Sequence, residues 1–216
     1  KKHVRIRPPR EIWEACLSFM QQMASETSSP GILKGSRYRD ALALGLLALR
    51  PLRRRNMSQL ILGEHLKLNN SRWECDIPGK ETKDGLPINF ILPTDKYFIM
   101  VYQRYLDTER QVLLKESQVD QDEIRDLQGP LWISTRGTAM TAHALYYAVI
   151  RISEELLGSP IYPHLLRTCA ASAISNESPE NILASCRVLG HSNLTTTLHY
   201  YEQSSMLAAG EHLSEA

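Results

Sequence analysis

Residues 37–49 constrain the fold of this chain more than any other segment. They end in the run Ala-Leu-Ala-Leu-Gly-Leu-Leu-Ala-Leu over positions 41–49, which would be apolar on every side of a helix. Such a helix has no face for water, so the rest of the chain must enclose it. The run falls well short of the roughly 20 residues of a membrane span. We therefore expect a central buried helix, capped by Ser36 and followed by Pro51.

The segments around this helix predict an α+β domain that is mainly helical. Apolar residues at helical spacing indicate a helix at 11–26 and a short one at 54–60. Three short segments separated by turn residues predict a small three-stranded antiparallel sheet, at 65–68, 72–77 and 88–92. Helical patterns then return at 94–106, in pieces over 107–126, and at 142–157, 163–176, 179–187 and 194–203. Thr141 is the expected cap of the helix that Gly158 ends.

Length and charge pattern indicate one domain with short extensions. A chain of 216 residues with 43% hydrophobic residues can form one substantial core. We expect a basic linker at 1–10, the domain at 11–203, and a tail at 204–216 that could dock on a neighbouring protomer. The net charge is only +1, but basic residues cluster at 1–10 and 50–55. Such an uneven distribution of charge allows one side of a nearly neutral protein to bind nucleic acid.

The cysteines indicate the cellular compartment. Cys16, Cys75, Cys169 and Cys186 are widely scattered, with no Cys-x-x-Cys pair. Structural zinc is therefore not expected. The chain also has no apolar segment of the signal-peptide type after its basic start. We expect reduced thiols in a cytoplasmic protein that has no membrane partner.

Two stretches near the end of the chain carry residues suited to phosphodiester chemistry. His164 and Arg167 lie one helical turn apart after Pro163, a residue that favours a helix start, so they face the same side. Downstream, His191 stands nine positions before Tyr200. Tyr201 would lie about 100° further around the helix, so only one of the two tyrosines can face a common target.

A tyrosine hydroxyl that attacks DNA needs a defined set of partners. Negative charge grows on the non-bridging phosphate oxygens in the transition state, and preorganised cations there lower the barrier. Arginine suits this role because its planar fork holds two oxygens and keeps its charge. The tyrosine must lose a proton, and the departing 5′ oxygen must gain one from a lysine or histidine. No metal or nucleotide is required, so we expect no cofactor.

These stretches resemble the tyrosine recombinase (phage integrase) family, whose motifs read His-x-x-Arg, then Leu-Gly-His, then Tyr. The resemblance covers residues 37–203 and implies the catalytic-domain fold of that family. It implies that Tyr200 is the nucleophile and that His191 hydrogen-bonds the scissile phosphate. It further implies that His164 is an acid/base group and that Arg167 clamps the phosphate. The family usually continues Arg-His-Thr, whereas this chain has Thr and Cys after Arg167.

The resemblance also implies a first arginine and a lysine upstream. The family pattern Thr-Gly-Leu-Arg-x-x-Glu aligns with residues 50–56, Arg-Pro-Leu-Arg-Arg-Arg-Asn, and places Arg53 at the catalytic position. Arg-Pro replaces Thr-Gly, and Asn56 replaces the acid. The family's lysine lies in the turn between the second and third strands. Lys83 is the preferred candidate in this turn, and Lys80 remains the alternative.

The resemblance implies a site-specific DNA recombinase that works through a 3′-phosphotyrosyl intermediate. Its partner would be double-stranded DNA, on which four identical or related protomers assemble. Without DNA the protein would be a monomer. The resemblance is compatible with integration, transposition, inversion or dimer resolution, and thus with a role in a mobile genetic element. Two alternatives also remain: a family member that binds DNA without cleaving it, and a type IB topoisomerase, which shares the fold but typically lacks the Leu-Gly-His segment.

Overall fold

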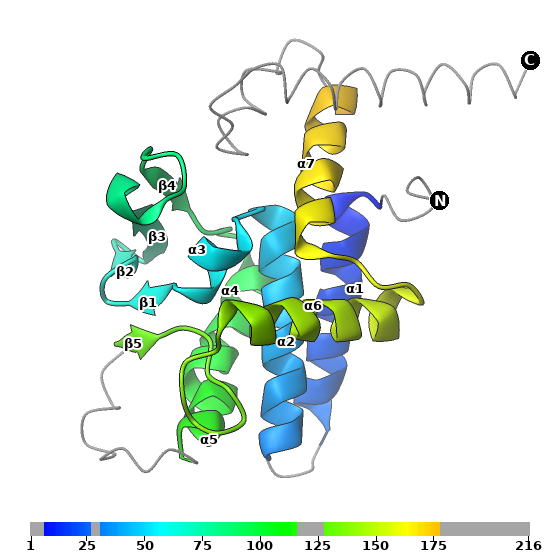
Figure 1. The fold of residues 1–216 in the computed structure, drawn as a ribbon. Helices are drawn as coiled ribbons and strands as arrows, with labels where there is room; N and C mark the ends of the chain where they lie inside the picture. The colour runs from blue at the N-terminus through cyan, green and yellow to red at the C-terminus, as the bar shows by residue number, and fades with distance from the viewer. Residues whose placement is uncertain (1–6, 27–30, 116–127, 178–216) are drawn as a thin grey trace, which may run out of the picture.

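The computed structural model describes residues 7–26, 31–115 and 128–177 (Figure 1). Most of this part of the chain is helical. The helices are α1 (Pro9–Ser25), α2 (Ile32–Leu49), α3 (Arg54–Ser58), α4 (Lys96–Arg104), the π-helical turn η3 (Tyr105–Glu109), α5 (Arg110–Leu114), α6 (Ala142–Leu157) and α7 (Pro163–Glu177). The strands are β1 (Ile61–Leu62), β2 (Leu66–Asn69), β3 (Arg72–Ile77), β4 (Ile88–Ile91) and β5 (Gly129–Pro130). None of the helices in these ranges is both long and apolar enough to cross a membrane.

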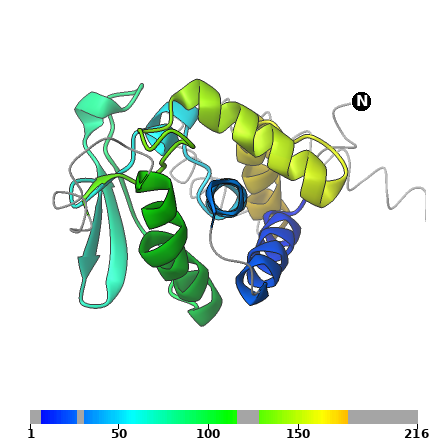
Figure 2. The same ribbon diagram turned by 90° about the horizontal axis from the view of Figure 1, so that it is seen from below.

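Helix α2 lies at the centre of the fold, as its sequence predicts. Every residue from 41 to 48 is buried. Figure 2 shows α2 end-on, with α1, α6, α7 and the α4–α5 segment around it. The predicted cap was wrong, because the helix begins after Gly31. Ser36 lies inside its first turns, where the hydroxyl donates to the Leu33 carbonyl (2.9 Å).

Two buried charges fix α2 to its neighbours. Asp40 is 2% exposed, and its two oxygens accept from Arg39 and from Arg151 of α6 (2.7 Å). Arg39 also donates to the carbonyl of Ile133. Buried charges are tolerated where they are paired and hydrogen-bonded in this way. The pairs hold α2 in one orientation relative to α6 and to the segment before it.

The sheet has five strands in the order β4-β3-β2-β1-β5, so the prediction of a three-stranded antiparallel sheet was wrong. The three predicted strands exist as the antiparallel unit β2-β3-β4. Strand β1 adds to β2 in parallel, and β5 adds to β1 antiparallel. These two strands have two residues each, which is too short for an alternating pattern to be recognised. Residues 54–60 were predicted as one helix, but α3 ends at Ser58, ahead of β1.

The caps of α6 agree with the sequence. The Thr141 hydroxyl oxygen accepts from the Ala144 amide (3.1 Å), and Gly158 ends the helix at φ +70°. Only glycine adopts such a left-handed conformation at little cost. The chain then turns into α7, which begins at Pro163 as expected.

We predict that Gly45→Ala destabilises the packing of α1 against α2. An added Cβ would lie 2.8 Å from a ring carbon of Trp13 and 3.4 Å from the Cβ of Cys16. Overpacking of this kind costs about 1–3 kcal/mol, partly offset by the helix preference of alanine. Chemical denaturation should show the loss, which should shrink in a Trp13→Leu background. Equal losses in both backgrounds would contradict the predicted overlap.

Candidate functional site

Arg53 stands at the start of α3, in the short connection that follows the buried end of α2. It is the N-cap residue, with an extended backbone, and the preceding Pro51 and Leu52 are buried. Its Nη1 lies 2.5 Å from Oδ2 of Asp84, in the connection between β3 and β4. The side chains of Arg53 and Asp84 are 28% and 17% exposed. The predicted first arginine therefore lies in contact with the predicted lysine turn.

The turn between β3 and β4 is compact and glycine-dependent. A 3-10 turn, η2 (Gly79–Glu81), begins it, and the Thr82 hydroxyl lies 3.0 Å from the Gly79 carbonyl oxygen. Gly85 has φ +71°, and a Cβ at Gly79 would overlap the carbonyl of Gly85. Asn56 of α3 forms a second link, since its amide nitrogen donates to the Glu81 carbonyl (3.1 Å). The turn is therefore held against α3 at two points.

Both candidate lysines lie in this turn and are exposed. Lys83 directly precedes Asp84, the residue paired with Arg53. Lys80 lies in η2 and lines a neighbouring cavity. Both lysines are therefore candidates for the proton donor of this turn.

Arg167 of α7 comes to the same connection from the opposite side. Its Nη1 donates to the carbonyl of Pro51 (2.7 Å), two residues before Arg53. His164 lies one turn earlier on α7 and is exposed. The structure thus brings Arg53, the β3–β4 turn and Arg167 together around the end of α2.

A chain of aromatic contacts leads from His164 to α3. The His164 ring lies nearly parallel to Tyr162, with centroids 5.9 Å apart and planes at 12°. Tyr162 in turn stacks on Tyr146 of α6 (6.2 Å), and the guanidinium of Arg54 lies 5.2 Å from the Tyr146 centroid. His164 is therefore linked through rings to the residue that follows Arg53.

Arg50, which replaces the family's threonine, has a structural role here. It donates to the Leu49 carbonyl (2.9 Å), and its guanidinium lies 5.8 Å from the centroid of the Phe90 ring on β4. Burial lowers its pKa below the usual arginine value. Arg50 thus joins the end of α2 to the sheet.

His191 and Tyr200 lie outside the described residues. The same holds for the predicted helices at 179–187 and 194–203 and for the tail at 204–216. Their placement stays a prediction from the sequence.

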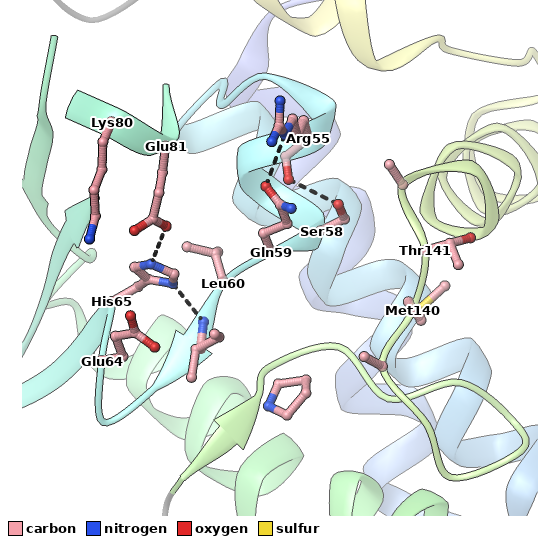
Figure 3. A pocket seen from close by; sticks show the side chains of 14 residues that line it. Arg55, Ser58, Gln59, Leu60, Glu64, His65, Lys80, Glu81, Met140 and Thr141 are labelled. Atoms are coloured by element: carbon pink, nitrogen blue, oxygen red, sulfur yellow. Dashed lines mark hydrogen bonds and ion pairs between the residues drawn. The ribbon is translucent and has the colours of Figure 1, made fainter. Parts of the chain in front are cut away.

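A cavity of about 480 Å³ opens between α3, the β3–β4 turn and the start of α6 (Figure 3). Its polar lining includes Arg55, Gln59, Lys80 and Thr141, together with a buried His65. Sequence reasoning did not single out this cavity. His65 was assigned only to a strand, and no spacing in the sequence connects it with residues 16 positions downstream.

His65 is fixed by hydrogen bonds on both ring nitrogens (Figure 3). Its Nδ1 accepts from the Ile61 amide (3.1 Å), so the neutral ring carries its proton on Nε2 and donates to Glu81 (2.9 Å). The ligand atoms of Glu64, His65 and Glu81 lie within 4.8 Å of one another. However, a metal needs a free imidazole lone pair, and this pairing leaves none. We interpret the cluster as a structural contact that links the β1–β2 turn to the β3–β4 turn.

The sequence and the fold assign the chain to a known family. The profile of the phage integrase family matches residues 18–206, so the chain belongs to that family. Among solved structures, it is similar to the XerH site-specific recombinase bound to palindromic difH substrate in a post-cleavage complex, with a TM-score of 0.64 and 19% identity over 95% of this chain and 52% of that one. The pre-cleavage complex of XerH with difH gives a TM-score of 0.60 and 19% identity over 88% and 48% of the two chains.

The chain thus spans about half the length of the recombinase chains it matches. A search of curated proteins finds no match. At this level of identity the structural likeness defines the fold, which is that of the tyrosine recombinases.

We predict a measurable coupling between Tyr162 and His164. Stacked aromatic pairs contribute about 0.5–1.5 kcal/mol beyond their buried area. In a double-mutant cycle of Tyr162→Ala and His164→Ala, the free energies of unfolding should be non-additive by an amount in this range. Tyr162→Phe keeps the ring and should preserve the coupling. Additive single effects would show that the stacking does not hold the imidazole.

Proposed function

We propose that this protein is a site-specific DNA recombinase that cleaves and rejoins DNA through a 3′-phosphotyrosyl intermediate. The observation that carries the proposal is the convergence of Arg53, the lysine turn and Arg167 around the end of α2. These residues come from three separate parts of the sequence. A pair of arginines and a lysine donor belong to the set of groups that phosphodiester cleavage requires. Membership of the phage integrase family supports the same conclusion.

In this mechanism Arg53 and Arg167 bind the non-bridging oxygens of the scissile phosphate. His191 donates a hydrogen bond to the same phosphate, and His164, as the acid/base group, accepts the proton that the Tyr200 hydroxyl loses. The Tyr200 hydroxyl attacks phosphorus, so that a Tyr–O–P bond forms as the bond to the 5′ oxygen breaks. Lys83, or Lys80 in its place, gives a proton to the 5′ oxygen as it leaves.

The second half of the reaction is the reverse step with a different strand. The 5′-hydroxyl of a partner strand attacks the phosphotyrosine and releases Tyr200. The bond energy is retained throughout, so no nucleotide or other cofactor is needed. Two rounds of this exchange through a four-way junction would recombine two duplexes.

We propose double-stranded DNA as the partner, with four protomers on two DNA sites and a monomer in its absence. The structural neighbours were solved bound to their own difH substrate, which supports DNA as the ligand class. We also propose a cytoplasmic location. In support, Cys16, Cys75 and Cys169 are buried and unpaired, and burial raises the pKa of Cys75 to about 12. Such thiols are unreactive and suit a reducing compartment.

A second candidate function is DNA binding without cleavage, as an accessory member of the family. The presence of Asn56 where the family pattern has glutamate favours this candidate, because an amide cannot form an ion pair with Arg53. The two candidates share DNA binding and differ in whether Tyr200 becomes covalently attached.

We predict a covalent adduct that depends on Tyr200. With a nicked suicide substrate, wild type should form a protein–DNA species that persists on a denaturing gel. Tyr200→Phe should form none while binding DNA as well as wild type does. Tyr201→Phe is the matched control and should retain the adduct. DNA binding without an adduct in wild type would favour the accessory role.

We predict that Lys83→Ala slows cleavage by about 10²–10⁴-fold, the usual contribution of general acid catalysis, whereas Lys80→Ala changes it little. A substrate with sulfur in place of the scissile 5′ oxygen needs no proton donor, because a thiolate leaves readily. It should restore the rate of the lysine variant that has lost the general acid. Restoration of Lys80→Ala instead would assign the role to Lys80.

A further inference from the structure

We propose that Asp84 is a positioning residue for Arg53 and takes the place of the acid that this chain lacks at position 56. The inference rests on the proposed function, since it concerns the arginine that would bind the scissile phosphate. It starts from two contacts on one turn: Asp84 Oδ2 lies 2.5 Å from Arg53 Nη1, and Asn56 binds the Glu81 carbonyl.

The contact of Asn56 explains why Arg53 needs a carboxylate from another part of the chain. The Asn56 amide nitrogen donates to the β3–β4 turn (3.1 Å), and its side chain is buried there. Asn56 therefore fastens the turn to α3. Its amide is neutral, so it supplies no negative charge to Arg53. The turn that it fastens carries Asp84, so the carboxylate reaches Arg53 from the sheet and not from α3.

An arginine that clamps phosphate gains from such a partner. Its long side chain loses rotamer entropy when it is fixed, and a carboxylate that fixes it beforehand removes this cost from the reaction. A guanidinium carries five N–H donors in a rigid fork. A carboxylate that binds one terminal nitrogen therefore leaves other N–H groups of the same guanidinium available for a phosphate oxygen.

The charge of Asp84 gives this role a distinct signature. A carboxylate beside Arg53 weakens the general attraction of the site for a polyanion, so its removal should leave DNA binding equal or slightly tighter. A positioning carboxylate nevertheless raises the rate of the chemical step. Removal of the carboxylate should therefore slow cleavage without weakening DNA binding, a combination that loss of folding would not produce.

The experiment compares wild type, Asp84→Asn and Asp84→Glu in single-turnover cleavage of the suicide substrate, with binding to the same DNA measured at one salt concentration. We expect Asp84→Asn to cleave roughly 10- to 100-fold more slowly, the scale of a misplaced catalytic group, with a dissociation constant equal to or below that of wild type. Asp84→Glu should recover part of the rate. Circular dichroism melting verifies that each variant is folded.

The substrate with a bridging sulfur shows whether Asp84 acts through Arg53 or through the lysine. If Asp84 acts through Arg53, Asp84→Asn stays slow on this substrate, whereas the general-acid variant recovers. Recovery of Asp84→Asn would mean that Asp84 acts through the lysine and would overturn the assignment. An unchanged or faster rate for Asp84→Asn on the ordinary substrate would also overturn it, because the carboxylate would then be neutral or inhibitory.

A measurement without cleavage distinguishes this inference from the proposed function. In a double-mutant cycle of Arg53→Gln and Asp84→Asn at low salt, the unfolding free energies should be non-additive. Additivity would refute the pairing whether or not wild type cleaves DNA. Coupling in a protein that forms no adduct would instead support the pairing while refuting the recombinase activity.

Discussion

The burial of α2 is the constraint on which the rest of the structure depends. A helix without a polar face can be accommodated only at the centre of the domain, so its end is fixed relative to every surrounding element. Pro51 then stops the helix, and Arg53 follows within a few residues. The first arginine therefore follows directly after an enclosed helix, whose close packing makes small displacements costly. A group that must meet a phosphate benefits from that placement.

The end of α2 is also the point where three parts of the chain meet. Arg50 ties it to the sheet, Arg167 brings α7 to the Pro51 carbonyl, and Asp84 brings the β3–β4 turn to Arg53. None of these contacts is local in sequence. Movement of the turn or of α7 would therefore displace the groups that surround Arg53.

The sequence was informative where the pattern was long or the chemistry local. It predicted α2, the caps of α6 and the three strands of the β2-β3-β4 unit. It did not predict β1 and β5, because two-residue strands carry no periodicity and are stabilised by pairing alone. It also misplaced the start of α2, since polar residues at 34–37 hid the first turn. The cavity lined by His65 has no local signal, because its walls come from distant segments.

The two departures from the family pattern Thr-Gly-Leu-Arg-x-x-Glu lie on the same side of the fold. Arginine in place of threonine at position 50 and asparagine in place of the acid at position 56 both contact the sheet side of the molecule. Arg50 contacts the Phe90 ring of β4, and Asn56 donates to the Glu81 carbonyl in the β3–β4 turn. Asp84 of the same turn lies against Arg53, so Arg53 has a carboxylate partner although position 56 carries an amide. Under the proposed role of Asp84, the two substitutions would change the elements that support Arg53 while its counter-charge stays in place.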